Sequence, residues 1–344
     1  MTAIVGNQKA KETLRQMLTR GRLPGTLLFS GPSGVGKRLF ALELARALNC
    51  HTPNGEWGCG ICAVCQRIGN FTLPAADDKD GHKKIVWGGH ADVGLVVPYN
   101  RNILVAAARN LDHEAHFRPY EGVARIFLIE EADKFNDESA NALLKTLEEP
   151  PSTTYIVLLT SRPSVLLPTI RSRCQTIRFT PLTAVEIENY LLLQGRASAT
   201  DAGLLARLAN GSLGRALSFN IAEYREQRSP MLEVLRALTV APDRVRLLRA
   251  AEDLTDAKQK ERYESNLDVL TGLVRDVWLL SLGAPENSLV NADIVSQLQP
   301  ICSYTPSRRA AHWLNAIAEH AQRLNVNINR KAATDALFLS LANA

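Results

Sequence analysis

Short apolar runs alternate with helical patterns along roughly the first half of the chain. Apolar stretches of strand length predict buried β-strands at residues 25–30, 95–97, 125–130, 155–160 and 175–179. Between them, apolar positions at helical spacing predict helices at residues 38–49 and 139–148. Strands that alternate with helices are typical of a parallel sheet with crossover helices, so this pattern predicts an α/β domain.

The strand pattern ends after Pro181, and only helical patterns follow it. Residues 183–222 predict a small group of helices, and residues 230–344 predict a larger helical domain, with clear helical spacing at 267–280 and 308–324. We therefore predict an α/β domain over 1–180, a small helical domain over 181–225 and an all-α domain over 226–344. Residues 71–91 interrupt the first domain and predict a polar surface loop, with a short hairpin as an option within it, and His90 is expected to be solvated.

The composition is that of a folded protein of two or three domains. Of the 344 residues, 46% are hydrophobic and 22% are charged, which is enough apolar side chain for packed cores. The net charge of +5 permits contact with nucleic acid but does not require it. No signal peptide and no apolar run of membrane-spanning length is visible, so we expect a soluble cytoplasmic protein.

A glycine-rich segment follows the first predicted strand and precedes a predicted helix. It reads GPSGVGK and matches the phosphate-binding pattern G-x-x-x-x-G-K in the context that this pattern requires. The pattern continues with Ser or Thr, whose hydroxyl binds Mg²⁺, but a guanidinium stands there in this chain and cannot bind a cation. Phosphate binding is compatible with this change, whereas metal-assisted hydrolysis is not expected to be efficient. The candidate nucleotide-binding residues are Gly31, Ser33, Gly34, Val35, Gly36, Lys37 and Arg38.

Acidic residues end the predicted strand at residues 125–130. Glu130 occupies the position of a carboxylate that holds Mg²⁺ through water, and Glu131 that of a carboxylate that polarises the attacking water. A strand that ends in acids is often only a solvated edge, but the phosphate loop upstream favours the nucleotide interpretation. Thr160 ends another buried strand and is expected to lie near the same site, with ATP and Mg²⁺ as its candidate ligands.

Four of the six cysteines gather between residues 50 and 65. Cys50, Cys59, Cys62 and Cys65 follow the spacing C-x8-C-x2-C-x2-C, which suits a knuckle around one tetrahedral Zn²⁺. Four thiolate ligands leave no position for a reacting water, so the predicted role is structural. The alternative is a set of four free thiols. Cys174 and Cys302 lie far away along the chain and are interpreted as isolated thiols.

Several further segments resemble one protein family and occur in its order. Residues 141–151 (NALLKTLEEPP) and 168–174 (PTIRSRC) resemble signature segments of the bacterial DNA polymerase III clamp-loader subunits, which are ATPases of the AAA+ superfamily. Residues 4–8 resemble the start of that fold, residues 211–216 its sensor-2 segment, and residues 324–341 its C-terminal collar helix. The cysteine spacing also matches the zinc module of these subunits. The resemblance spans nearly the whole chain.

This resemblance implies an AAA+ phosphate-loop domain, a helical lid and an α-helical collar. It implies that Arg173 is an arginine finger offered in trans to a neighbour's ATP, and that Thr160 and Arg215 are sensors 1 and 2. It also implies a hetero-oligomeric complex with tau/gamma and delta subunits that loads a sliding clamp onto primed DNA, located at the nucleoid during replication.

Two branches of the family fit this chain to different degrees. The motor branch, tau/gamma, is expected to keep a hydroxyl after the loop lysine and an Asp–Glu pair, and Arg38 and Glu130 depart from both expectations. The chain therefore resembles the delta-prime branch, whose ATPase activity is expected to be weak or absent. A tau/gamma-like motor is the alternative. A stand-alone phosphate-loop kinase is a third, but it lacks an acceptor-substrate motif and leaves the helical C-terminal third without a role.

Overall fold

The computed structural model describes residues 4–55, 57–240, 242–256, 262–324 and 329–343. The chain divides into two units, Met1–Tyr190 with Ala209–Leu217, and Leu191–Leu208 with Ser218–Ala344. The finer division into three domains stays a prediction. Within the described ranges, no helix combines the length and the apolar character needed to cross a membrane.

The first unit is built on a six-stranded sheet with the strand order β2-β3-β4-β5-β1-β6. All neighbouring strands are parallel except β2 and β3, which pair antiparallel. Strands β1 and β4 are buried along their whole length, as expected for strands covered on both faces. The predicted α/β fold with a parallel sheet is therefore confirmed. The strands are β1 (Thr26–Ser30), β2 (Val86–Trp87), β3 (Val93–Val96), β4 (Arg125–Ile129), β5 (Thr154–Thr160) and β6 (Gln175–Arg178).

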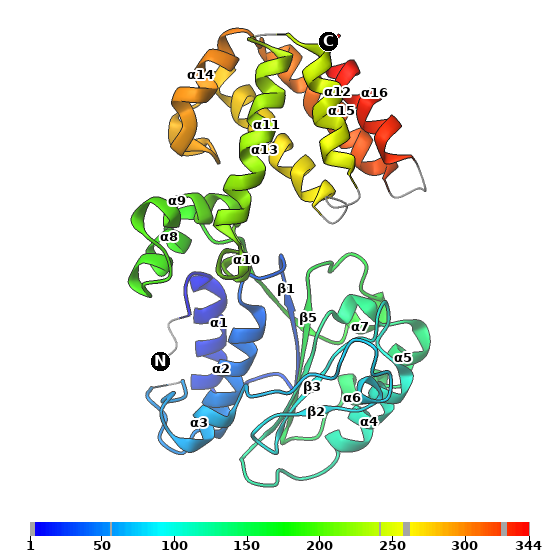
Figure 1. The fold of residues 1–344 in the computed structure, drawn as a ribbon. Coiled ribbons are helices and arrows are strands. Elements are labelled where there is room, and N and C mark those ends of the chain that lie inside the picture. The colour runs from blue at the N-terminus through cyan, green and yellow to red at the C-terminus, as the bar shows by residue number, and fades with distance from the viewer. Residues whose placement is uncertain (1–3, 56, 241, 257–261, 325–328, 344) are drawn as a thin grey trace. The chain divides into compact units, whose positions relative to one another are not determined.

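Helices cover both faces of this sheet (Figure 1). Strand residues alternate between the two resulting cores, so that in β1 Leu27 and Phe29 pack in one core and Leu28 packs in the other. Helices α1 (Gln8–Thr19), α2 (Lys37–Asn49) and α3 (Ala63–Arg67) lie on one side of the sheet. The other side carries α4 (Val105–Ala115), α5 (Asp137–Asn141), α6 (Leu144–Glu148) and α7 (Pro168–Arg171).

The prediction of a single helix over residues 139–148 is wrong, because this segment contains the end of α5 and the whole of α6. A capping box between Asn136 and Ser139 starts α5 before the predicted helix. At the junction, the N–H of Leu143 donates to the carbonyl of Ala140 at 2.9 Å, an i to i−3 bond that tightens the turn. The buried Ala140, Leu143 and Leu147 all remain in one core through this tightened turn.

The segment predicted as a polar loop over residues 71–91 contains a short 3-10 helix, η1 (Gly81–Lys83), and the edge strand β2. His90 was expected to be solvated, and this prediction is wrong because its side chain is fully buried. Its Nδ1 accepts a hydrogen bond from the N–H of Asp92 at 3.2 Å. The buried Asp92 carboxylate in turn accepts hydrogen bonds from the N–H groups of residues 120–122, which join a distant segment to the one that carries the histidine.

Only helices follow β6 among the described residues, as the sequence predicts. The predicted helices at 267–280 and 308–324 correspond to α13 and α15, and α16 lies within the predicted segment 324–341 except for its last residue, although residues 325–328 lie outside the described ranges. The α-helices are α8 (Ala184–Leu193), α9 (Ala199–Leu208), α10 (Leu213–Ser218), α11 (Ile221–Leu238), α12 (Arg244–Thr255), α13 (Tyr263–Ser281), α14 (Val295–Ser303), α15 (Ser307–Arg323) and α16 (Arg330–Ala342), with 3-10 turns η2 (Ala132–Lys134), η4 (Glu286–Ser288) and η5 (Ala292–Ile294).

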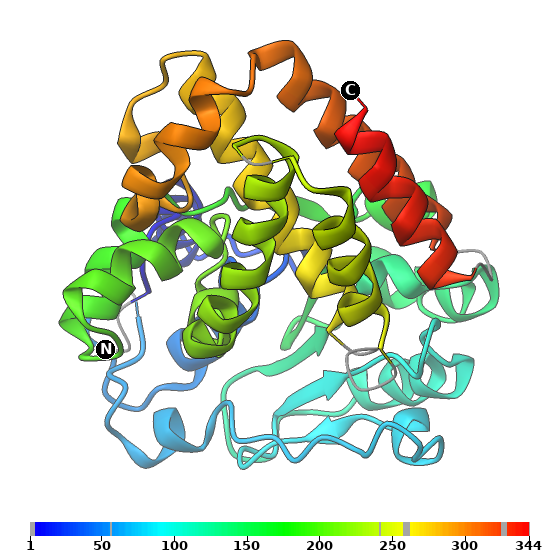
Figure 2. The same ribbon diagram turned by 45° about the horizontal axis from the view of Figure 1, so that its top comes forward.

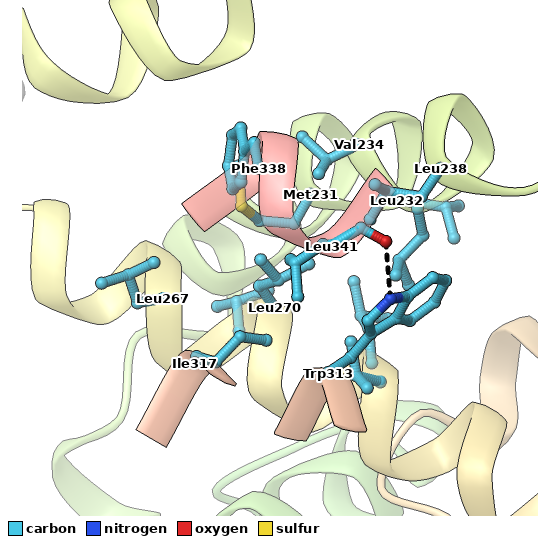
Figure 3. Packing of buried hydrophobic residues seen from close by; sticks show 14 of the residues in the cluster. Met231, Leu232, Val234, Leu238, Leu267, Leu270, Trp313, Ile317, Phe338 and Leu341 are labelled. Atoms are coloured by element: carbon cyan, nitrogen blue, oxygen red, sulfur yellow. Dashed lines mark hydrogen bonds between the residues drawn. The ribbon is translucent and has the colours of Figure 1, made fainter. Parts of the chain in front are cut away.

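The second unit has one hydrophobic core of its own. Figures 1 and 2 show α16 running beside α12 and α15 within this unit. Trp313 is a fully buried member of this core, and its indole Nε1–H donates to the carbonyl of Leu341 at 2.9 Å (Figure 3). Because a buried Trp needs a partner for its N–H, this bond ties the C-terminal helix to α15.

Candidate nucleotide site and metal centre

The segment Gly31–Lys37 forms the predicted loop between the carboxyl end of β1 and the start of α2. Gly34 has a φ of +72°, a conformation that favours glycine, and a Cβ there would lie 2.0 Å from Ser212 Oγ. The carbonyl of Gly34 also accepts the N–H of Gly214 at 3.0 Å. The loop is therefore packed tightly against the residues that precede and begin α10.

Lys37 lies over the loop itself. Its Nζ donates to the carbonyls of Gly31 and Pro32, each at 2.6 Å. Burial lowers the pKa of Lys37, and the nearby Asp133 carboxylate opposes this effect. The ammonium group is thus held at the loop by backbone carbonyls, in the position where the motif places a phosphate-binding cation.

Arg38 and Glu130 form an ion pair across the end of the sheet. Arg38 Nη1 lies 3.0 Å from Glu130 Oε1, and the guanidinium carbon lies 5.6 Å from the centre of the Phe71 ring. Burial raises the pKa of Glu130, Arg38 opposes that rise and Glu131 adds to it. These residues do not fit Mg²⁺. The Arg38 guanidinium stands where the motif has a hydroxyl ligand, and it also pairs with the Glu130 carboxylate that would bind the metal.

Glu131 follows directly and has a different partner. Its backbone has a φ of +45°, which is uncommon for a residue other than glycine, and its carboxylate lies 2.8 Å from Lys134 Nζ. The side chain remains more than half exposed at the cavity. Both acids that end β4 are therefore already paired with cations of the chain.

Thr160 belongs to a buried polar cluster at the end of β5. Its hydroxyl donates to Asp133 Oδ1 at 2.6 Å, while Arg162 Nε donates to Asp133 Oδ2 at 2.8 Å. Burial opposes ionisation of Asp133, but the hydrogen bonds from Thr160 and Arg162 outweigh it and lower the pKa of this carboxyl. The sequence analysis missed Asp133 and Arg162, although Asp133 follows the two acids of β4 closely and Arg162 follows Thr160.

One cavity of about 430 Å³ brings most of the predicted site residues together, a volume in the range of small-molecule sites. Among the predicted residues, Gly31 and Val35 belong to the loop but do not line it, and neither do Arg173 and Arg215. The cavity also includes residues that the sequence analysis did not single out, such as Tyr190 of α8. Its lining residues are Ser33, Gly34, Gly36, Lys37, Arg38, Leu39, Glu130, Glu131, Leu159, Thr160, Ser161, Tyr190, Leu213, Gly214 and Leu217.

Arg173 and Arg215 lie in different places. Arg173 follows α7, where its Nε lies 3.0 Å from Glu148 Oε2 and its Nη1 donates to the carbonyl of Thr169 at 2.9 Å. Arg215 lies in α10, and its backbone N–H donates to Ser212 Oγ at 3.1 Å. The two arginines therefore do not join the cavity formed by Lys37 and Arg38.

The four predicted cysteines form a second candidate site. Their Sγ atoms all lie within 4.8 Å of one another, with Cys50 and Cys62 3.8 Å apart and Cys59 and Cys65 4.0 Å apart. Four sulfurs around one ion at about 2.3 Å would lie ~3.8 Å apart, so the donor set fits a tetrahedral metal. The cluster could therefore hold one metal ion.

Backbone N–H groups point at these sulfurs. The N–H of Cys59 donates to Cys50 Sγ at 3.3 Å, that of Cys62 to Cys59 Sγ at 3.3 Å, and that of Cys65 to Cys62 Sγ at 3.4 Å. The Thr52 hydroxyl, aided by backbone N–H groups, lowers the pKa of Cys59 to about 5, and the N–H of Cys65 lowers the pKa of Cys62. Burial instead raises the pKa of Cys65 to about 12.

Arg46 attaches the cysteine knuckle to α2. Its guanidinium donates to the carbonyls of Cys65 at 3.0 Å and Ile68 at 2.8 Å, and it also pairs with Glu43. Gly58 packs against the same arginine, because a Cβ there would lie 2.6 Å from Arg46 Cβ. The knuckle is therefore fixed to the helix that begins at the phosphate loop.

Comparison with known proteins gives one consistent result. A profile of the family described as DNA polymerase III, delta subunit, matches residues 6–183, about half of the chain. The chain is 29% identical to DNA polymerase III subunit delta-prime of Bacillus subtilis over 97% of this chain and 95% of that protein. It is 29% identical to the delta-prime subunit of Escherichia coli over 93% and 90% of the two chains.

Similarity to the tau subunit is more limited. The tau subunit of Escherichia coli is 34% identical, but the match covers 62% of this chain and 31% of that protein. The two delta-prime relatives are thus matched along nearly their full length, as the sequence resemblance implied. The chain belongs to the DNA polymerase III delta subunit family.

Proposed function

We propose that this subunit works in the clamp loader of DNA polymerase III as a delta-prime-like member, which offers an arginine finger and hydrolyses little or no ATP itself. The observation that carries this proposal is the Arg38–Glu130 ion pair at 3.0 Å, which occupies the place of the Mg²⁺ shell. A motor subunit needs that shell to neutralise charge on the transferring phosphoryl group. The similarity to delta-prime subunits along nearly the full chain supports the same conclusion.

The proposed finger is Arg173. Its position outside the cavity of its own chain suits a residue that acts on a neighbour's nucleotide. Glu148 and the Thr169 carbonyl orient the guanidinium, yet the Arg173 side chain keeps 29% of its surface exposed. A planar guanidinium with several donors is suited to stabilise charge that develops on a transferring phosphoryl group. Thr160 and Arg215 are proposed to occupy the sensor positions of the same family.

The cysteine knuckle is proposed to hold one structural Zn²⁺. Four sulfur donors complete a tetrahedral shell and leave no site for substrate or water. The bound ion would fix residues 50–65 against α2, in addition to the hydrogen bonds that Arg46 makes. Its contribution is therefore to the stability of the first unit and not to a chemical step.

The proposed partners are the tau/gamma and delta subunits, with the sliding clamp and primed DNA contacted through the complex. Such a complex would act in the cytoplasm, at the nucleoid. Residues 226–344 are proposed as the collar that assembles the subunits, and 181–225 as the lid. A tau/gamma-like motor is the second candidate, because Lys37 and the cavity are retained and part of the chain is similar to tau.

Reconstitution tests the proposed function. The purified chain is mixed with the tau/gamma and delta subunits of the same source, and the products are separated by size. We expect a stable complex that contains this chain, and we expect clamp loading on primed DNA to fall when the chain is left out. Failure of the chain to enter the complex would contradict the proposal.

A further inference from the structure

Arg38 is held in place at the wall of the cavity, beside the phosphate loop. Arg38 is fixed on two sides, by the Glu130 carboxylate at 3.0 Å and by the Phe71 ring at 5.6 Å from the guanidinium carbon. Phe71 itself is partly buried in the core on that side of the sheet. The guanidinium is therefore held at the cavity wall and is not a mobile surface group.

We infer that this cavity binds a nucleoside diphosphate or triphosphate as a metal-free anion, with the Arg38 guanidinium in the role that Mg²⁺ has at other phosphate loops. The inference rests on the proposed function in one respect, the assignment of the loop to nucleotide phosphates. It adds the form of the ligand and predicts that Mg²⁺ neither assists nor is needed for binding.

The charges that line the cavity exclude a divalent cation. Glu130 pairs with Arg38, and Glu131 lies 2.8 Å from Lys134, so each lining carboxylate already has a cation of the chain beside it. Mg²⁺ requires near-octahedral oxygen ligands at about 2.0–2.1 Å, and Arg38 offers only donors. A divalent ion would have to compete with a cation of the chain at either carboxylate, with Arg38 at Glu130 or with Lys134 at Glu131.

The same groups favour a polyanion. Lys37 and Arg38 bring two positive charges to one wall of the cavity. Gly36 at the N-cap of α2 has no side chain to cap the first N–H groups of this 13-residue helix, and the N-terminal end of a helix favours an anion. An arginine can bind two phosphate oxygens at once through its planar fork, much as Mg²⁺ bridges the oxygens of neighbouring phosphates at other phosphate loops.

Calorimetric titration of the purified full chain with ADP tests this inference. One titration contains EDTA and the other contains millimolar Mg²⁺. We expect binding in both, with dissociation constants that differ by less than about twofold. In Arg38→Thr, the loss of a charged hydrogen-bonding partner is expected to weaken binding in EDTA by roughly tenfold or more. Mg²⁺ is expected to recover part of the lost affinity in this variant.

Two further variants serve as controls. Arg20→Thr removes the same charge from an exposed position at the end of α1, and we expect binding like that of the wild type. Arg38→Lys keeps the charge without the planar fork, and we expect an affinity in EDTA between those of wild type and Arg38→Thr. Thermal unfolding midpoints within a few degrees of the wild type show that each variant is folded.

Two results would overturn the inference. One is the absence of ADP binding by the folded wild-type chain in EDTA, and the other is a tenfold or greater gain in its affinity with Mg²⁺. Neither result bears on whether the chain enters the complex or supplies Arg173. Conversely, a chain that binds metal-free ADP but fails to enter the complex would contradict the proposed function alone.

Discussion

Arg173 and Glu148 form an ion pair, with Arg173 Nε 3.0 Å from Glu148 Oε2. The carboxylate comes from the end of α6 and the arginine from the turn after α7, so the pair joins two segments of the family signature. More than half of the Glu148 side chain is exposed, and such pairs contribute little to folding stability. The pair therefore orients Arg173 without locking it to its own chain.

Glu148→Gln tests this interpretation. We expect the free energy of unfolding to change by less than about 1 kcal/mol, because the pair is largely solvated. We expect the ATPase rate of the reconstituted complex to stay close to that of the wild type, and above that of Arg173→Ala, since Thr169 still holds the guanidinium. A loss of several kcal/mol in chemical denaturation would show that Glu148 has a structural role instead.

The purified chain is expected to carry about one equivalent of zinc, measured by elemental analysis of protein prepared without added metal. Cys65→Ser removes the buried ligand and should lower both the zinc content and the thermal midpoint, the latter by more than about 5 °C. Cys302→Ser is the matched control, because that thiol lies in the second unit and should leave the zinc content unchanged. A folded wild-type protein with four reactive thiols and no metal would rule out the zinc site.

The isolated chain is expected to show no Mg²⁺-dependent ATP turnover above that of Lys37→Ala. The reason is that Arg38 pairs with Glu130 at the position of the metal shell. Phosphate release measured with ATP and Mg²⁺ provides the comparison. Turnover by the wild type that Lys37→Ala abolishes would replace the present assignment with the motor alternative.

The stability of the second unit is expected to fall in mild acid. His320 is buried, and its Nε2 lies 2.7 Å from the hydroxyl of Tyr263. Burial, with a smaller effect of Arg323, lowers the pKa of His320 below its usual value of 6.5. The unfolded chain therefore binds this proton more readily than the folded chain does. The contribution of neutral His320 to the free energy of unfolding is therefore fully present above the pKa of this residue in the unfolded chain. It is lost as the pH falls from that value towards the lower pKa in the folded chain.

Chemical denaturation at pH 7.5 and pH 5.5 measures this effect. We expect a smaller free energy of unfolding at pH 5.5 for the wild type. We expect a smaller difference between the two pH values for His320→Gln, which cannot take up the proton but keeps a polar group near Tyr263. An identical pH dependence in both proteins would exclude His320 as a cause.

Five of the six strands, all except the edge strand β2, and the positions of both candidate sites could be predicted from local sequence. The loop that ends at Lys37 and the cysteine spacing are contiguous motifs, so they need no knowledge of distant contacts. The departure of Arg38 from its motif was also visible in the sequence. The parallel order of the strands then brings the ends of β1, β4 and β5 to one edge of the sheet, which gathers Lys37, Glu130 and Thr160.

The partners of these side chains could not be predicted in the same way. The pairing of Arg38 with Glu130 joins residues far apart in the sequence, and Phe71 reaches the same guanidinium from a segment that looks like a polar loop. Likewise, nothing near His90 in the sequence indicates that the backbone of residues 120–122 binds the neighbouring Asp92 carboxylate. These outcomes depend on packing between separate segments and not on local pattern.

The most direct test of the account is the ATPase rate of the reconstituted complex with primed DNA and clamp, for Arg173→Ala against the wild type. An arginine finger in trans is worth roughly 10³–10⁵ in rate at the site that it serves. Because only one of several sites is affected, we predict that the total rate falls by roughly the share of that site and not by the full factor, while the variant still folds and enters the complex. An unchanged rate in a complex that contains Arg173→Ala would contradict the account.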